Sequence, residues 1–208
     1  MEEKALGSRK IRAAETKERI YKSAEYLFSN NRFDYVSVDD IVKHAKVAKG
    51  SFYVHFESKD ELIAILINDN VKKTDMNYKA YLESLPDEMP IDDIFLSLVS
   101  KIADVITHDI GYENMKNLYK IHITQDIKTK VITDYNREIY IIFNEIITKG
   151  MEQNVFQSVF SADEIAKHFV AAYRGLTLDW CIRYPDFDLK EQALNLFKIL
   201  LTAIKSSI

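Results

Sequence analysis

Apolar residues recur along most of the chain at spacings of three and four, which is the period of an α-helix with one buried face. Polar turns interrupt this pattern only at intervals, and glycine and proline are scarce, with 5 and 3 residues. The pattern therefore predicts an all-α fold of about nine helices. The expected helices cover residues 14–30, 37–45, 49–56, 58–81, 91–108, 112–123, 126–150, 161–184 and 188–205.

The stretch from Ser37 to Lys59 predicts two short helices joined by a tight turn, followed by the start of a longer helix. Ser37 is a favourable N-cap, and Asp40 stands three residues later, at the spacing of a capping box. Lys46-Val47-Ala48 interrupts the apolar period, and Phe52 and Phe56 then lie four residues apart. This spacing turns both rings to one side of the second short helix.

The other sides of that helix are left to Lys49, Ser51, Tyr53 and His55, with no acidic residue before Glu57. Gly50 has no side chain, so the start of the helix can approach a phosphate closely. The free N–H groups and the positive end of the helix dipole also favour an anion there. The pattern predicts a helix-turn-helix whose second helix enters the major groove of DNA. A helical hairpin within an ordinary bundle is the alternative.

The segment from Ser37 to Leu62 closely resembles the DNA-binding segment of the tetracycline-repressor (TetR) family of bacterial regulators. The resemblance rests on Lys49-Gly50-Ser51-Phe52-Tyr53, His55-Phe56 and Ser58-Lys59-Asp60-Glu61-Leu62, within the first third of the chain. Two positions depart from the family pattern. Lys46 replaces a common glycine, so either it adopts the turn conformation at a steric cost or the turn differs slightly. Ala48 replaces a common Ser or Thr, which removes a helix cap worth about 1 kcal/mol.

The resemblance implies a domain over residues 1–57, made of an N-terminal arm and the helix-turn-helix, that binds a double-stranded DNA operator. It also implies a helical effector-binding and dimerisation domain over residues 58–208. The candidate DNA-binding residues are Ser37, Lys46, Ala48, Lys49, Gly50, Ser51, Tyr53, His55 and Lys59.

Charge is distributed unevenly, although the net charge of −4 at first argues against a nucleic-acid partner. Residues 1–60 carry +2 and the remainder carries −6, so the basic end is the one that holds the motif. A basic cluster from Lys4 to Arg12 precedes the first helix, in an expected arm over residues 1–14. The arm is interpreted either as a contact to the DNA backbone or minor groove or as a solvated terminus.

A single cysteine, Cys181, excludes an intrachain disulfide and fits a reducing cytoplasm. No signal peptide and no apolar stretch long enough to span a bilayer is evident, so we expect a cytoplasmic protein without a membrane partner. Cys181 is expected to be a buried small apolar residue rather than a redox sensor.

The last two expected helices are apolar around much of their circumference, which requires partners on both sides. A second copy of the chain would supply one partner, and the resemblance implies a homodimer formed through these two helices. It also implies a small-molecule effector held by the larger domain. The candidate pocket residues are Phe95, Tyr112, Met115, Tyr119, His122, Tyr135, Phe143, Phe169, Tyr173 and Trp180, although aromatic residues at helical spacing are more often core.

Catalytic and metal signals are absent from the sequence: no phosphate-binding glycine loop, HExxH, Gly-x-Ser-x-Gly or His pair at helical spacing is found. We therefore expect no enzyme activity, cofactor or metal. The function predicted is a dimeric transcriptional regulator, a repressor that binds a palindromic operator and is released by a small-molecule effector. The alternative is the same fold acting as an activator or as a ligand-independent DNA-binding regulator.

Overall fold

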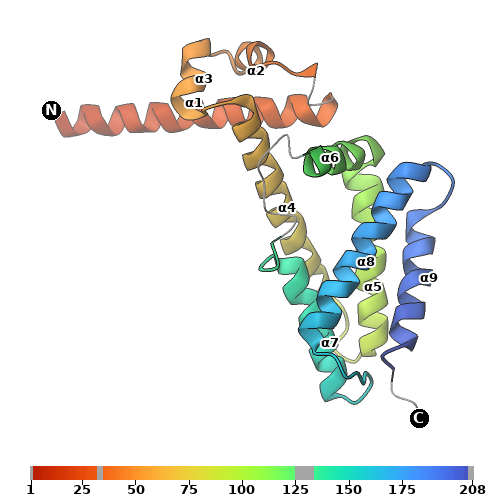
Figure 1. Ribbon diagram of the computed structural model, residues 1–208. Helices are drawn as coiled ribbons and strands as arrows, with labels where there is room; N and C mark the ends of the chain where they lie inside the picture. Colours follow the sequence, from red (N-terminus) through yellow and green to blue (C-terminus); the bar gives the residue numbers. More distant parts are fainter. Residues whose placement is uncertain (1, 32–34, 125–133, 206–208) are drawn as a thin grey trace. The chain divides into compact units, whose positions relative to one another are not determined.

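The computed structural model describes residues 2–31, 35–124 and 134–205, with side chains described from residue 10 onward. The regular structure in these ranges is helical, which confirms the predicted all-α fold (Figure 1). The elements are α1 (Glu2–Asn30), α2 (Val38–Ala45), α3 (Lys49–His55), α4 (Lys59–Glu83), α5 (Ile91–Asp104), the π-helix η2 (Val105–Ile110), α6 (Tyr112–Thr124), α7 (Glu138–Glu152), α8 (Ala162–Arg183) and α9 (Leu189–Thr202). None of these helices is both long enough and apolar enough to cross a bilayer.

The residues of the chain form two compact units. Unit 1 comprises residues 1–69 and 120–129, and unit 2 comprises residues 70–119 and 130–208. The helix α4 is continuous through residue 69, so its first part belongs to unit 1 and its second part to unit 2. The division expected after residue 57, between a DNA-binding domain and an effector-binding and dimerisation domain, stays a prediction.

Unit 1 is built around the apolar faces of α1, α2, α3 and the start of α4. Ile20, Ala24 and Phe28 of α1 are buried, as their spacing predicts. The expected arm over residues 1–14 was wrong for the described residues, because α1 begins at Glu2. The physical reason is the composition of this segment: Glu, Lys, Ala and Leu favour helices, and acidic residues at the start suit the positive end of the helix.

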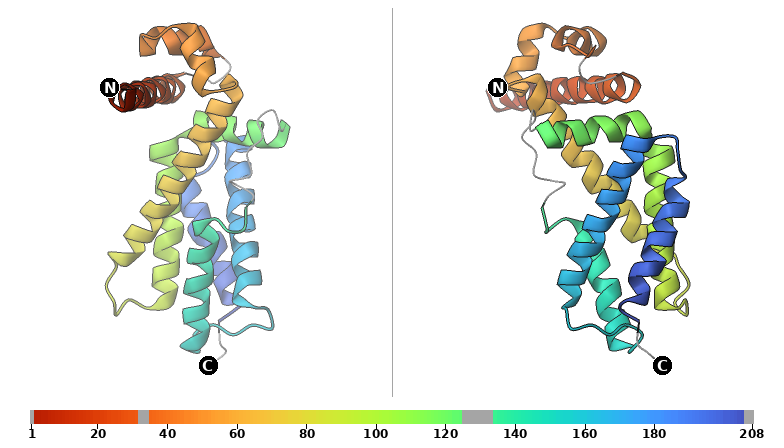
Figure 2. Two further views of the ribbon diagram at one scale, coloured as in Figure 1. Left: turned by 90° about the vertical axis from the view of Figure 1, so that its left-hand side faces the viewer. Right: turned by 45° about the vertical axis from the view of Figure 1, so that its right-hand side comes forward.

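Unit 2 contains one apolar core, to which α5, α7, α8 and α9 contribute. The helix α7 packs against α8, and α5 packs against α9 and α7 (Figure 2). Phe197 of α9 has its ring centroid 5.7 Å from that of Phe95, 5.6 Å from Phe169 and 5.5 Å from Tyr173. These edge and tilted arrangements are the ones aromatic rings favour in well-packed interiors.

The start of α7 differs from the prediction, which placed it at Asp126. In the described residues α7 begins at Glu138, and residues 126–133 lie outside them. Asp134 instead forms a local turn, because its carboxylate accepts a hydrogen bond from the backbone N–H of Asn136 at 2.9 Å. Asp and Asn side chains bond nearby backbone groups in this way and compete with helix formation.

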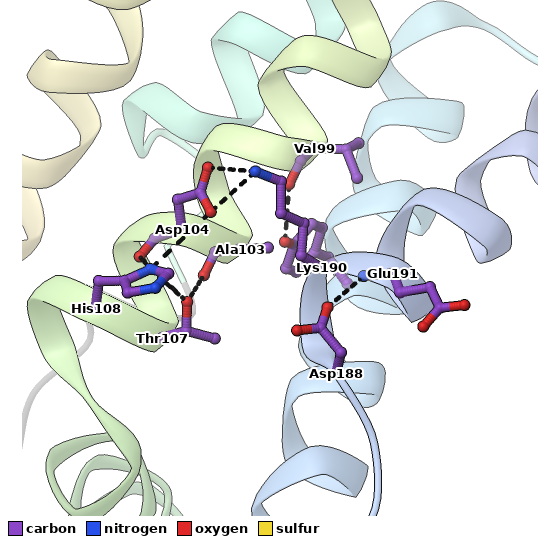
Figure 3. A network of polar contacts seen from close by, with 9 residues as sticks. Val99, Ala103, Asp104, Thr107, His108, Asp188, Lys190 and Glu191 are labelled. Carbon is purple, nitrogen blue, oxygen red and sulfur yellow. Dashed lines mark hydrogen bonds and ion pairs between the residues drawn. The ribbon is translucent and has the colours of Figure 1, made fainter.

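The end of α5 also differs from the prediction of a single helix over residues 91–108. The α-helical pattern ends at Asp104 and continues as η2, whose last turn is closed by the N–H of Gly111 bonded to the carbonyl of Ile106 at 2.9 Å. Gly111 has φ of 77°, which suits glycine and ends the helix as its sequence position predicts. Thr107 donates its hydroxyl to the carbonyl of Ala103 at 2.8 Å, within this transition (Figure 3).

The same transition is tied to the first turn of α9. The Lys190 ammonium donates to both oxygens of Asp104, at 2.8 and 3.1 Å (Figure 3). A contact of this kind fixes where α5 ends relative to α9, since it joins residues 86 positions apart in the sequence.

Two ion pairs join the second part of α4 to the start of α7. Arg137 makes a two-pronged contact with Asp75, at 2.7 and 2.8 Å, and the Asp75 side chain is only 1% exposed. Lys79 pairs with Glu138 at 3.0 Å, with side chains 42% and 26% exposed. The first pair is thus shielded from water, whereas the second is partly solvated.

We expect Asp75→Asn to lower the free energy of unfolding by about 3–5 kcal/mol, because it leaves the Arg137 charge largely buried without its partner. Chemical denaturation followed by circular dichroism measures the loss. The matched control is Lys79→Met, which removes a charge from the neighbouring, more exposed pair and should change stability little. Equal effects of the two substitutions would contradict the importance of burial.

Candidate nucleic-acid interface

The start of α2 is fixed by the predicted capping box between Ser37 and Asp40. The Asp40 N–H donates to the Ser37 hydroxyl oxygen at 3.1 Å, and the Ser37 backbone N–H donates to the Asp40 carboxylate at 2.9 Å. The Ser37 hydroxyl also donates to that carboxylate at 2.6 Å. These hydrogen bonds from Ser37 hold the pKa of Asp40 below its ordinary value. The box is confirmed, and it anchors the first helix of the motif.

The turn between α2 and α3 depends on an unusual conformation at Lys46. This residue has φ of 54° and ψ of 48°, in the left-handed region expected from the glycine common in the family. Its N–H donates to the carbonyl of Lys43, and the N–H of Val47 donates to that of Val42 at 3.0 Å. These are the bonds that close the end of a helix.

Arg19 of α1 also supports this turn, and sequence reasoning missed it. Its guanidinium donates to the carbonyls of Ala45 and Lys46, the latter at 2.9 Å. A cation at the carboxyl end of α2 complements the partial negative charge of the helix dipole. These two contacts join residues 26 and 27 positions apart in the sequence, so no local sequence pattern predicts them.

The inner face of α3 is held by two phenylalanines, as predicted. Phe52 and Phe56 are 0% and 1% exposed, and their ring centroids lie 5.6 Å apart. Ala48 occupies the N-cap without a side-chain hydrogen bond, which confirms the missing cap. Gly50 is exposed, and a Cβ atom built there would meet nothing within 4 Å. No residue in the described ranges therefore packs closely on Gly50.

The outer face of α3 displays most of the predicted DNA-binding residues. Lys49, Gly50 and Tyr53 are exposed, while Ser51 and His55 are half-buried. Ser37, Lys46 and Ala48 are also exposed, on the flanking cap and turn. Lys59 is half-buried and donates its ammonium to the carbonyl of Val36 at 3.1 Å. The structure thus collects all nine candidates within unit 1, along α2, the turn, α3 and the first residue of α4.

Two further residues belong to this surface and were not predicted. Val54 is 76% exposed on α3, because it stands two residues from each buried phenylalanine and so faces away from them. Asp39, in the first turn of α2, pairs with the Lys49 ammonium at 2.9 and 3.0 Å. The position of Val54 could have been found from the helical period, whereas the Asp39–Lys49 pair joins two different helices.

Comparison with known proteins bears directly on this motif. The family model described as bacterial regulatory proteins, tetR family, matches residues 20–65, which run from α1 through α2 and α3 into α4. Residues 20–65 of this chain therefore carry the DNA-binding segment of the TetR family. The regulator EthR of Mycolicibacterium smegmatis is 33% identical over 67 residues, a match that covers 32% of this chain and only 31% of EthR.

The likeness to TetR-family regulators extends beyond the motif in other comparisons. The regulator AcrR of Shigella flexneri is 25% identical over 203 residues, covering 92% of this chain and 90% of AcrR. The crystal structure of a TetR-family regulator from Pectobacterium atrosepticum has a TM-score of 0.76 at 15% identity, covering 95% and 97% of the two chains. FadR of Bacillus subtilis, solved with stearoyl-CoA, has a TM-score of 0.67 at 15% identity, covering 90% and 98%. The two structures show a shared fold. The family match and the similarity to curated regulators indicate that the chain is a helix-turn-helix transcriptional regulator.

The effector-pocket candidates fall into distinct groups. Phe95, Phe143, Phe169, Tyr173 and Trp180 are buried in the core of unit 2. Three further candidates in unit 2 are half-buried: Tyr112, Met115 and Tyr119. Tyr135, which precedes α7, is 60% exposed. His122 is half-buried and falls in unit 1. The buried phenylalanines contact one another, with 5.3 Å between the ring centroids of Phe95 and Phe143.

Two of these candidates, Tyr173 and Tyr119, use their hydroxyl groups in hydrogen bonds inside unit 2. The Tyr173 hydroxyl donates to the carbonyl of Val99 at 3.0 Å, and burial raises its pKa well above the ordinary value. The Tyr119 hydroxyl donates to the carbonyl of Arg174 at 2.7 Å, and the Arg174 guanidinium donates to the Tyr140 hydroxyl at 2.8 Å. These bonds join α6, α7 and α8 around the inner aromatic residues.

Cys181 is buried in α8, as predicted for a small apolar residue. Burial raises the pKa of its thiol to about 11, so the less nucleophilic neutral form prevails at neutral pH. Among the described residues, no group of three His, Cys, Asp or Glu side chains is placed to hold a metal ion.

The strained turn gives a direct test. We expect Lys46→Gly to raise the free energy of unfolding by about 0.5–1 kcal/mol, because removing a left-handed Cβ costing 1–2 kcal/mol outweighs the added freedom of glycine in the unfolded chain. Urea denaturation measures this. Lys43→Gly is the matched control. Because Lys43 lies within α2, this substitution should lower the free energy of unfolding by about 1 kcal/mol. A loss at both positions would mean that Lys46 is not strained.

Proposed function

We propose that this regulator is a dimeric repressor that binds a palindromic operator through α3 and is released by a small-molecule effector. The observation that carries the proposal is the outer face of α3, which presents Lys49, Tyr53 and Val54 to solvent with Gly50 at its start. A short helix with a cation, a phenol and an apolar methyl surface outward fits the major groove, whose edges offer acceptors and thymine methyl groups.

The roles on this face divide into positioning and reading. Lys49, Tyr53 and Lys59 supply N–H and O–H donors to phosphates, and His55 can do so from its half-buried position. Ser51 and Val54 are assigned to base edges, with Val54 against a thymine methyl. Ser37 would add a phosphate contact at the start of α2.

The dimer proposal rests on an unpartnered stripe along α8 and α9. Ala171, Gly175 and Ile182 of α8 are exposed at helical spacing, with Ile182 at 73%, and Ile199 of α9 is 69% exposed. A Cβ atom at Gly175 would meet nothing within 4 Å in the single chain. Small residues beside exposed isoleucines suit a close helix-to-helix contact with a second copy related by a two-fold axis.

We expect the double substitution Ile182→Asp, Ile199→Asp to convert a dimer into single chains at micromolar concentration. Each copy places these charges in the interface, so association should weaken by roughly 2 kcal/mol or more. Sedimentation analysis measures the oligomeric state. Val159→Asp is the control, because Val159 is 95% exposed and lies outside α8 and α9. A wild-type protein that remains a single chain would overturn the dimer proposal.

The operator is tested by selecting fragments of genomic DNA that the purified protein retains. We expect an inverted repeat whose half-sites are separated by about one helical turn or a multiple of it, because two α3 helices related by a two-fold axis read related sequences. Gly50→Ala should weaken binding to the selected site without lowering stability, since its Cβ meets nothing in the free chain. Retention of no specific fragment at low ionic strength would refute the proposal.

The effector is proposed from the solved TetR-family structures and from the aromatic interior of unit 2. FadR of Bacillus subtilis and FadR of Thermus thermophilus were solved with stearoyl-CoA and lauroyl-CoA, and the latter has a TM-score of 0.64 at 19% identity, covering 89% of this chain and 93% of that one. An acyl-CoA series, with free CoA as control, is therefore the first set to test. A true effector would add about 2.7 kcal/mol to the free energy of unfolding at 100 times its dissociation constant, and would therefore raise the thermal midpoint. It would also release the protein from the operator.

A further inference from the structure

We propose that Asp39 is an internal counter-ion for Lys49, which a DNA phosphate must displace before Lys49 can bind the duplex. The inference deepens the proposed function and rests on it, because it names a residue that sets the strength and salt dependence of DNA binding. Asp39 was not among the predicted site residues, and the DNA-binding surface described above is incomplete without it.

The geometry of the pair supports a competition. The Lys49 ammonium lies 2.9 Å from one carboxylate oxygen of Asp39 and 3.0 Å from the other. Asp39 stands in the first turn of α2, and Lys49 is the first residue of α3, so the pair bridges the two helices of the motif. A carboxylate held on both oxygens occupies the same donors that a phosphate oxygen would use.

The exposure of both side chains indicates that the Asp39–Lys49 pair contributes little to the stability of the fold. The side chains of Lys49 and Asp39 are 54% and 68% exposed, and ion pairs in such positions add little to stability. Asp39 raises the pKa of Lys49, first through the hydrogen bond and then through its charge, which is the direction expected when a carboxylate stabilises a cation. The pair can therefore open without loss of the fold.

The neighbouring acid has a different partner. Asp40 is bonded to the backbone and hydroxyl of Ser37 in the capping box, so its charge is used at the start of α2. Asp39 instead turns to Lys49, a residue assigned to phosphate contact. When a phosphate takes Lys49, the carboxylate is left beside the DNA backbone, where it must attract a cation from solution.

This exchange has a consequence for salt dependence. Each phosphate neutralised by a lysine releases counterions and steepens the plot of log affinity against log salt by about 0.9. A cation recaptured by Asp39 offsets that release. Asp39→Asn should therefore tighten binding to an arbitrary duplex at low salt and make the slope steeper, by up to about 0.9 for each motif in contact with DNA.

The experiment measures binding of the full-length protein to a labelled duplex without inverted repeats, by fluorescence anisotropy over a range of salt from about 50 to 200 mM. Four proteins form a double-mutant cycle: wild type, Asp39→Asn, Lys49→Gln and the double variant. Asp60→Asn is the matched control, because Asp60 is an exposed acid in the first turn of α4, as Asp39 is in α2. Circular dichroism checks that each variant is folded.

We expect Asp39→Asn to raise low-salt affinity roughly two- to fourfold, to steepen the slope and to exceed the effect of Asp60→Asn. In the Lys49→Gln background the same change should have no more effect than Asp60→Asn. An equal gain with and without Lys49 would overturn the proposal, because Asp39 would then act only as a general negative charge. If the wild type binds duplex DNA and Asp39→Asn does not raise its affinity, the proposal is also overturned. Failure of every variant to bind any duplex would instead refute the proposed function itself.

Discussion

The burial of two phenylalanine rings, one in the seven-residue helix α3 and the other at its C-cap, constrains everything that unit 1 presents to a partner. A helix this short is not stable by itself in water, since its few internal hydrogen bonds do not offset the ordering of the chain. Phe52 and Phe56 supply the missing free energy through tertiary packing. Their fixed direction also determines which residues face outward, so the same contact that stabilises α3 orients Lys49, Tyr53 and Val54.

The turn before α3 shows how the motif tolerates an unfavourable residue. Lys46 adopts a left-handed conformation that glycine would adopt more easily, and the neighbouring carbonyls are bonded by the Arg19 guanidinium. Support from α1 thus compensates at the place where the local sequence is least suited to the turn. The cation also places positive charge on the α2 side of the motif, which accords with a basic N-terminal third.

Much of this architecture could be predicted from the sequence, because periodicity, caps and breakers are local signals. The cap at Ser37 and the burial of Phe52 and Phe56 were confirmed at the residues their patterns indicated. The failures have equally physical causes. The helix predicted to include residues 134–137 is not formed there, because the Asp134 carboxylate bonds the backbone N–H of Asn136 in a turn.

The contacts that were missed join residues far apart in the chain. The partners Asp75 and Arg137, like Arg19 and Lys46, are ordinary charged residues whose importance depends on the fold. Phe197 was not among the pocket candidates, yet its ring meets several of theirs, because α9 packs against α5. The candidate residues for DNA were more easily found, since they lie within one short segment that needs only its own helical period to be sorted into inner and outer faces.

The π-helical turn at Val105–Ile110 has a consequence for how this protein tolerates changes of length. Hydrogen bonds that skip five residues accommodate one residue more per turn than an α-helix requires. A chain shorter by one residue in this stretch could continue α5 as a regular α-helix and still reach Gly111. A deletion of one residue in unit 2 should therefore be absorbed best here, provided that Val105 and Ile106 keep their places in the apolar core.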